Sequence, residues 1–134
     1  IDLAFTGDAW KGETVAELQQ LIYSTGARPI GVETSELIAI AQLMKNRAHG
    51  ANVRLESSGI RNQVTALLAS ALDPGLFSEV ITRRGMRSLD YVLQKPVEYE
   101  AAPDLFCLDL LRETNLDRLV ALSAPVRVLN EQPN

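Results

Sequence analysis

Two adjacent serines, Ser57 and Ser58, lie where a short apolar run changes into a helical pattern. A serine on a sharp strand-to-helix turn can attack an acyl carbon, because the helix amino terminus stabilises the negative charge of the intermediate. A serine at a helix start can instead act as a cap by accepting a hydrogen bond from a backbone amide two or three residues later. Local sequence favours capping, because Leu55 replaces the first glycine of G-x-S-x-G and only Gly59 matches the motif.

The only histidine of the chain, His49, cannot serve as the base for Ser57. A serine–histidine pair requires the two side chains within roughly 2.6–3.2 Å of each other. His49 precedes an expected strand and Ser57 follows it, so at roughly 3.3 Å per residue the strand separates them by about 13 Å. Any catalytic acid and histidine acting with Ser57 would therefore come from outside this chain.

Four polar residues around the same turn are candidates for ligand binding: Glu56, Ser58, Arg61 and Asn62. Sites in parallel sheets gather at the carboxyl ends of strands, which is where Glu56 is expected. Arg61 and Asn62 belong to the first turn of the following helix. They can contact an anionic or sugar-like ligand, or they can remain solvated.

A basic cluster at residues 82–87 follows the next expected strand. Its arginines can bind a carboxylate or phosphate through paired hydrogen bonds, or they can pair with acids of the chain. No metal site is expected, because one cysteine and one histidine do not form a ligand set. Glu33 and Glu36 flank Ser35 at an expected helix start, where carboxylates interact favourably with the helix dipole. We expect no cofactor.

Helical periodicity alternates with short apolar runs along the chain. Helices are predicted at 13–24, 33–50, 57–73, 86–96 and 102–125, the last divided near 113–115. Strands are predicted at 1–5, 52–56, 77–85 and 126–130, with a loop at 27–32. This alternation predicts an α/β fold with a mainly parallel sheet flanked by helices. We expect Val53–Glu56 to occupy a central position in that sheet.

Composition excludes several classes of protein. With 134 residues, 46% hydrophobic and 22% charged, the chain is long enough for one domain spanning 1–134. The net charge of −4 argues against nucleic-acid binding, and no apolar run is long enough to cross a membrane. We expect a soluble protein. Because the chain opens on Ile1, we expect it to be part of a larger protein, and any signal for secretion or a periplasmic location would lie upstream.

Residues 20–130 resemble the C-terminal part of a bacterial α/β-hydrolase of the acetyl xylan esterase or dipeptidyl-peptidase-like type. The segment 53–89 resembles the nucleophile strand, elbow, helix and next strand, and 103–129 resembles the later helices and strand. The resemblance implies a partial three-layer architecture and a serine esterase acting on an acylated carbohydrate or similar ester. Ser57 is the only position that matches a catalytic residue of the family.

Two readings from other classes remain open. One is a non-catalytic, hydrolase-like module that binds a carbohydrate or packs against another domain. The other is a structural module that associates through an exposed sheet edge, because an uncovered edge strand readily pairs with another chain. The partner at that edge would be a missing segment of the parent protein or a second copy.

Overall fold

The computed structural model describes residues 1–7, 15–107 and 109–131. Its centre is a three-stranded parallel sheet in the order β1-β2-β3, formed by β1 (Val53–Ser58), β2 (Phe77–Arg83) and β3 (Arg127–Glu131). The predicted α/β class and parallel sheet are confirmed. The strand β1 lies at an edge of the described sheet, however, so the expected central position for Val53–Glu56 is wrong: β2 takes it.

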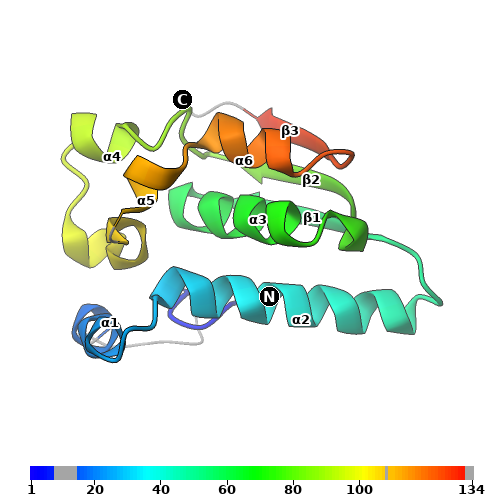
Figure 1. Ribbon diagram of the computed structural model, residues 1–134, viewed down its shortest axis with the longest axis horizontal. Helices are drawn as coiled ribbons and strands as arrows, with labels where there is room; N and C mark the ends of the chain where they lie inside the picture. The colour runs from blue at the N-terminus through cyan, green and yellow to red at the C-terminus, as the bar shows by residue number, and fades with distance from the viewer. Residues whose placement is uncertain (8–14, 108, 132–134) are drawn as a thin grey trace.

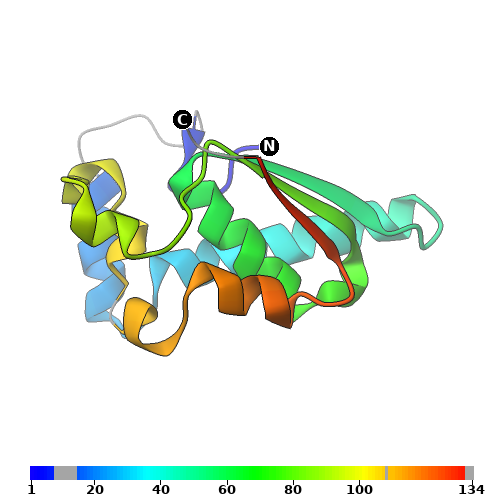
Figure 2. The same ribbon diagram turned by 90° about the horizontal axis from the view of Figure 1, so that it is seen from above.

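Two helices connect the strands and pack on the sheet (Figures 1 and 2). Helix α3 (Ile60–Leu72) links β1 to β2, and α6 (Leu116–Leu122) belongs to the connection from β2 to β3. Right-handed crossovers in this strand order place both helices on one face. The core fills the space between sheet and helices, with Val64 and Leu67 of α3 and Val80 of β2 fully buried.

The opposite face of the sheet is covered by charged side chains rather than by a described helix. Arg54 pairs with Glu56 at 2.8 Å and with Glu79 at 3.3 Å, and Arg83 pairs with Glu131 at 3.1 Å. Most of these groups are exposed, as Arg54 is at 57%. The described residues thus form two layers where three were expected.

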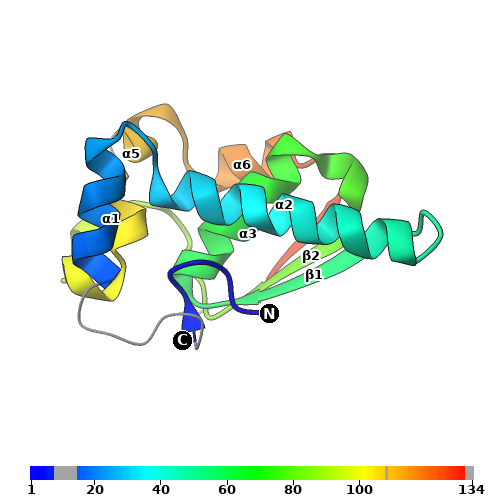
Figure 3. The same ribbon diagram turned by 90° about the horizontal axis from the view of Figure 1, so that it is seen from below.

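Helix α2 (Pro29–Arg47) packs against α3 and runs along β1 on the side away from β2 (Figures 1 and 3). Helix α1 (Val15–Ser24) contacts the amino-terminal part of α2. The helix α2 begins four residues earlier than predicted. Pro29 stands in its first turn, where the missing N–H of proline costs nothing. Of the loop expected at 27–32, residues 27–28 are confirmed and residues 29–32 are helical instead.

Short helical pieces join β2 to β3 at one end of the domain. They are α4 (Tyr91–Gln94), two 3-10 turns η3 (Tyr99–Ala101) and η4 (Pro103–Phe106), and α5 (Leu110–Glu113); another 3-10 turn, η2 (Pro74–Leu76), precedes β2. The predicted helix at 86–96 reduces to α4. The predicted division near 113–115 is confirmed, because the Asn115 side chain accepts from the amide of Leu116 and caps α6.

Residues 1–7 form turns rather than the strand predicted at 1–5. The segment is held by the backbone amide of Ala4, which donates to the Glu36 carboxylate at 2.7 Å, and by packing of the buried Leu3. Among the described residues, no helix is long and apolar enough to cross a membrane.

Candidate functional site

The turn from β1 to α3 is built around Gly59. Both serines belong to the strand, and Gly59 occupies the N-cap position with φ of 88° and ψ of 162°. Its amide donates to the carbonyl of Arg83 at 2.9 Å, which ties the turn to β2. No side chain of the described residues caps α3, so the prediction that Ser57 or Ser58 caps the helix is wrong. The strand β1 ends at Ser58, two residues after the end predicted from the sequence at Glu56.

Ser57 lies in the strand with its hydroxyl facing the interior. Its Oγ is buried and has no hydrogen-bond partner among the described residues. The side chain lines a groove between β1 and α2. His49 lies in the turn that precedes β1, whereas Ser57 is the fifth residue of the strand. The two side chains therefore belong to opposite ends of β1, as expected.

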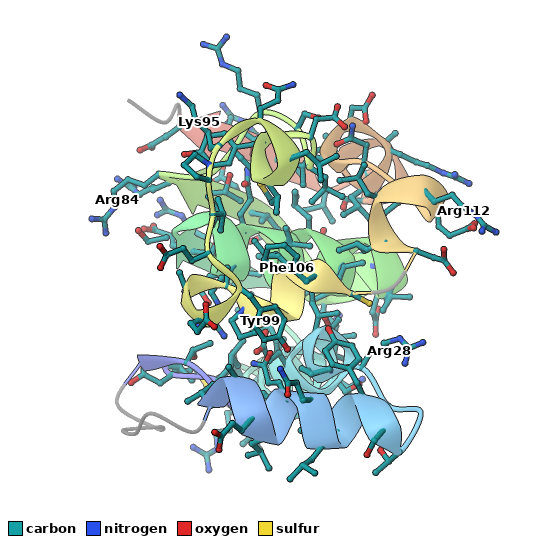
Figure 4. All side chains as sticks on the ribbon, turned by 90° about the vertical axis from the view of Figure 1, so that its left-hand side faces the viewer. Arg28, Arg84, Lys95, Tyr99, Phe106 and Arg112 are labelled. Carbon is teal, nitrogen blue, oxygen red and sulfur yellow. The ribbon has the colours of Figure 1, made fainter. Side chains whose placement is uncertain are left out.

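Ser58 is joined to Arg84, which follows β2. The hydroxyl oxygen accepts from Nε of Arg84 at 3.0 Å and from Nη2 at 2.8 Å. The Asn62 side chain donates to the carbonyl of Ser58 at 3.0 Å and holds the end of the strand. Arg84 projects from the edge of the molecule in Figure 4, on the side opposite Arg112. Ser58 thus holds the fork of a mainly exposed arginine beside the first turn of α3.

A pocket of about 300 Å³ opens at the amino terminus of α3. Its lining residues are Thr6, Gly7, Ser58, Gly59, Ile60, Arg61, Asn62 and Ala101. The first amide of the helix that bonds back along the chain is that of Gln63, to the carbonyl of Gly59. The preceding helical amides lack intrahelical partners, and the helix dipole adds positive potential at this end. The arrangement suits an anionic group.

The structure brings together three of the four predicted binding residues, Ser58, Arg61 and Asn62, around this pocket. Glu56 instead lies on the charged face of the sheet, paired with Arg54 and, at 3.5 Å, with Arg83. Arg61 directs its guanidinium inward. Its Nε donates to Asp104 at 2.5 Å and its Nη2 donates to the carbonyl of Phe5 at 3.0 Å.

Behind the pocket, the guanidinium of Arg61 lies close to two buried carboxylates. Asp104 and Glu33 are 0% and 1% exposed, and Glu33 lies 3.7 Å from Nη2 of Arg61. The Thr65 hydroxyl donates to the other oxygen of Glu33 at 3.2 Å. We call Glu33, Arg61, Thr65 and Asp104 the buried acid cluster. It contains two acids and one cation, so its charges do not balance when both acids are ionised.

Burial dominates the protonation of the buried acid cluster. Desolvation, with the nearby charge of Asp104, raises the pKa of Glu33 to about 8 against the lowering effect of Arg61. Burial also raises the pKa of Asp104, again opposed by Arg61. Glu33 is therefore mainly protonated at neutral pH, and Arg61 is left to pair with Asp104. The expectation that Glu33 stabilises the dipole at a helix start is wrong, because α2 begins at Pro29 and the Glu33 carboxyl is buried.

Two further kinds of reactive group were considered in the part of the chain that the structure describes: the cysteine thiol and possible metal ligands. Burial raises the pKa of the Cys107 thiol, which disfavours the reactive thiolate. No group of three histidine, cysteine, aspartate or glutamate side chains that could hold a metal occurs in the described ranges.

Two contributors were not identified individually from sequence. Arg84 was visible only as part of the basic cluster at 82–87, which did not indicate which arginine turns toward Ser58. Asp104 gave no signal, because its partner Arg61 is 43 residues away in the chain.

No protein-family model, no curated protein and no solved structure matches this chain. The functional inference therefore depends on the geometry of the site.

Proposed function

We propose that this chain is a hydrolase-like module that binds a small anionic ligand at the amino terminus of α3 without catalysing acyl transfer. The observation that carries the proposal is the pocket lined by Ser58–Asn62, with the fork of Arg84 already turned toward the Ser58 hydroxyl beside it. A carboxylate or phosphate group suits this setting, because it can accept hydrogen bonds from both helix amides and a guanidinium.

The turn geometry supports binding over catalysis. In hydrolases that use a nucleophile elbow, the serine occupies the strained position of the strand-to-helix turn, where its hydroxyl is exposed. Here the positive φ angle falls on Gly59, which has no side chain, and Ser57 precedes it by two residues with a buried hydroxyl. A buried hydroxyl without a base is a poor nucleophile.

A serine esterase acting through Ser57 on an acylated carbohydrate is the second candidate. One observation favours it: no structural hydrogen bond among the described residues occupies the Ser57 hydroxyl, which lines the groove beside β1. This candidate needs an acid and a histidine from outside the chain. It predicts covalent labelling of Ser57 by a fluorophosphonate when those groups are supplied.

Amide chemical shifts measured during a titration with inorganic phosphate, and separately with acetate, test the binding proposal. We expect the largest changes at Ile60, Arg61 and Asn62, with matched chloride additions as the ionic-strength control. Arg84→Gln should weaken binding by about tenfold or more, because it removes a charge-assisted pair of hydrogen bonds. Arg112→Gln is the matched control, since Arg112 is 75% exposed and lies on the side of the molecule opposite Arg84 (Figure 4).

Equal weakening by the two arginine variants, or shift changes spread over the whole surface, would contradict an anion site at α3. Fluorophosphonate labelling, carried out with the outside acid and histidine supplied, separates the two candidates. Labelling that Ser57→Ala abolishes and Ser58→Ala preserves would establish the esterase. Phosphate binding with no labelling supports the binding module.

A further inference from the structure

The outer edge of β1 is open among the described residues. Its inner edge pairs with β2 from Val53 to Ser58, and no other described strand or backbone hydrogen bond joins the outer one. An edge strand with free N–H and C=O groups is a template for another strand. Its exposed side chains, Arg54 and Glu56, point to the charged face of the sheet.

A groove of about 420 Å³ follows this edge, with α2 as its far wall. From α2 it is lined by Leu37, Ile40, Ala41 and Met44, and from the strand by all six residues of β1. Its floor includes Ala66 and Phe77. Met44 is 47% exposed, so part of the apolar wall faces solvent. The helix α2 thus covers the space next to β1 in the way that α3 covers β1 and β2 (Figure 3).

The start of the chain also lines this groove: Leu3 is buried, whereas Ile1 is 93% exposed. The slot beside β1 has two unlike sides, one apolar toward α2 and one charged at Arg54 and Glu56. An extended segment presents alternate side chains to opposite sides, so the two sides of the slot suit a segment in which apolar and polar residues alternate.

We propose that this groove takes an extended polypeptide segment that adds to the outer edge of β1 as a fourth strand. Every second residue of the segment is apolar and faces α2. The residues between them complement the charged face, with an acidic side chain opposite Arg54 and a basic one opposite Glu56. Main-chain hydrogen bonds provide affinity and the apolar wall provides specificity. The proposal is independent of the anion site, which lies at the amino terminus of α3.

A second copy of the chain fits this slot less well. Pairing two β1 strands edge to edge would match Arg54 with Glu56 of the other copy. Each copy, however, carries α2 beyond its own β1 in the layer of helices that covers the sheet (Figures 1 and 3). Two such helices would compete for the same space. A single extended segment brings no helix with it.

The probe is a synthetic peptide with blocked ends that carries valine at alternate positions, with one aspartate and one lysine between the valines. Two versions are made: one with the aspartate before the lysine and one with the lysine before the aspartate. We expect one of these two peptides to protect the outer-edge amides of β1 from hydrogen exchange in the full chain. A peptide of the same composition with its valines consecutive is the sequence control. Met44→Lys should weaken binding by at least about tenfold, because it places a charge in the apolar wall.

Leu43→Lys is the matched variant: Leu43 is 48% exposed on the same helix but does not line the groove. It should leave peptide affinity unchanged. Three outcomes would overturn the proposal: no new protection of β1 amides at millimolar peptide, equal loss in both lysine variants, or the same amides becoming protected by self-association of the peptide-free chain. Sedimentation across a range of concentrations detects the last.

Discussion

Removing the ionisable group at Glu33 should change how stability depends on pH. The folded pKa is about 8 and the ordinary value is 4.5, so between these values the folded carboxyl keeps a proton that the unfolded chain releases. Stability from this group is fully present below pH 4.5 and is lost as pH rises through 8. At about 1.4 kcal/mol for each unit of pKa difference, the loss is on the order of 5 kcal/mol.

The substitution Glu33→Gln retains an oxygen that can accept the Thr65 hydroxyl but cannot ionise. Urea unfolding at a series of pH values measures the effect. We expect the free energy of unfolding of the variant to gain on wild type by about 3 kcal/mol between pH 5.5 and 7.5, and the difference to level off above pH 8. Glu17→Gln, an exposed carboxylate on α1, is the control for loss of one negative charge.

The buried acid cluster contains a second titrating group, so some slope should remain in Glu33→Gln. Burial raises the pKa of Asp104 as well, which acts in the same direction. Parallel profiles for wild type and Glu33→Gln from pH 5 to 8 would refute the reasoning. They would mean that Arg61, at 3.7 Å, outweighs the burial of Glu33.

Two further predictions concern groups that hold the site in place. Arg61→Gln should lower the free energy of unfolding by about 3 kcal/mol or more, because Asp104 would remain buried without its cation. Urea denaturation measures this change, and a loss below about 1 kcal/mol would contradict the pairing of Arg61 with Asp104. Gly85→Ala should cost about 2 kcal/mol, because its Cβ would lie 2.4 Å from the Gln63 side chain, which exchanges two hydrogen bonds with the backbone of Met86. The shift in thermal midpoint measures the second change. Exchange of the Met86 amide that is as slow in the variant as in wild type would show that the bonds survive and would contradict this prediction.

The helices and strands that were predicted correctly from the sequence are those marked by strong patterns of neighbouring residues. The apolar runs of β1, β2 and β3 and the helical periodicity of α1 and α3 identified these elements. Asn115 marked the start of α6, since a cap depends on neighbouring residues only. The predictions that proved wrong concern segments whose structure depends on contacts with residues distant in the chain. In residues 1–5, Leu3 is buried although the segment forms no strand, and 86–96 supports only one helical turn.

Sequence alone also established that His49 and Ser57 belong to opposite ends of one strand, because strand length follows from residue count. It could not show that Gly59, rather than a serine, takes the turn position, because that depends on where pairing with β2 ends.

Only the tertiary structure decided which charged residues are buried. The sequence placed Glu33 at a helix start, yet it lies one turn inside α2, and the packing of η4, α2 and α3 encloses it with Asp104 and Arg61. These three residues come from segments far apart in the chain, and local patterns carry no information about such contacts. Periodicity and capping are short-range properties, whereas desolvation of a charge depends on everything that packs around it.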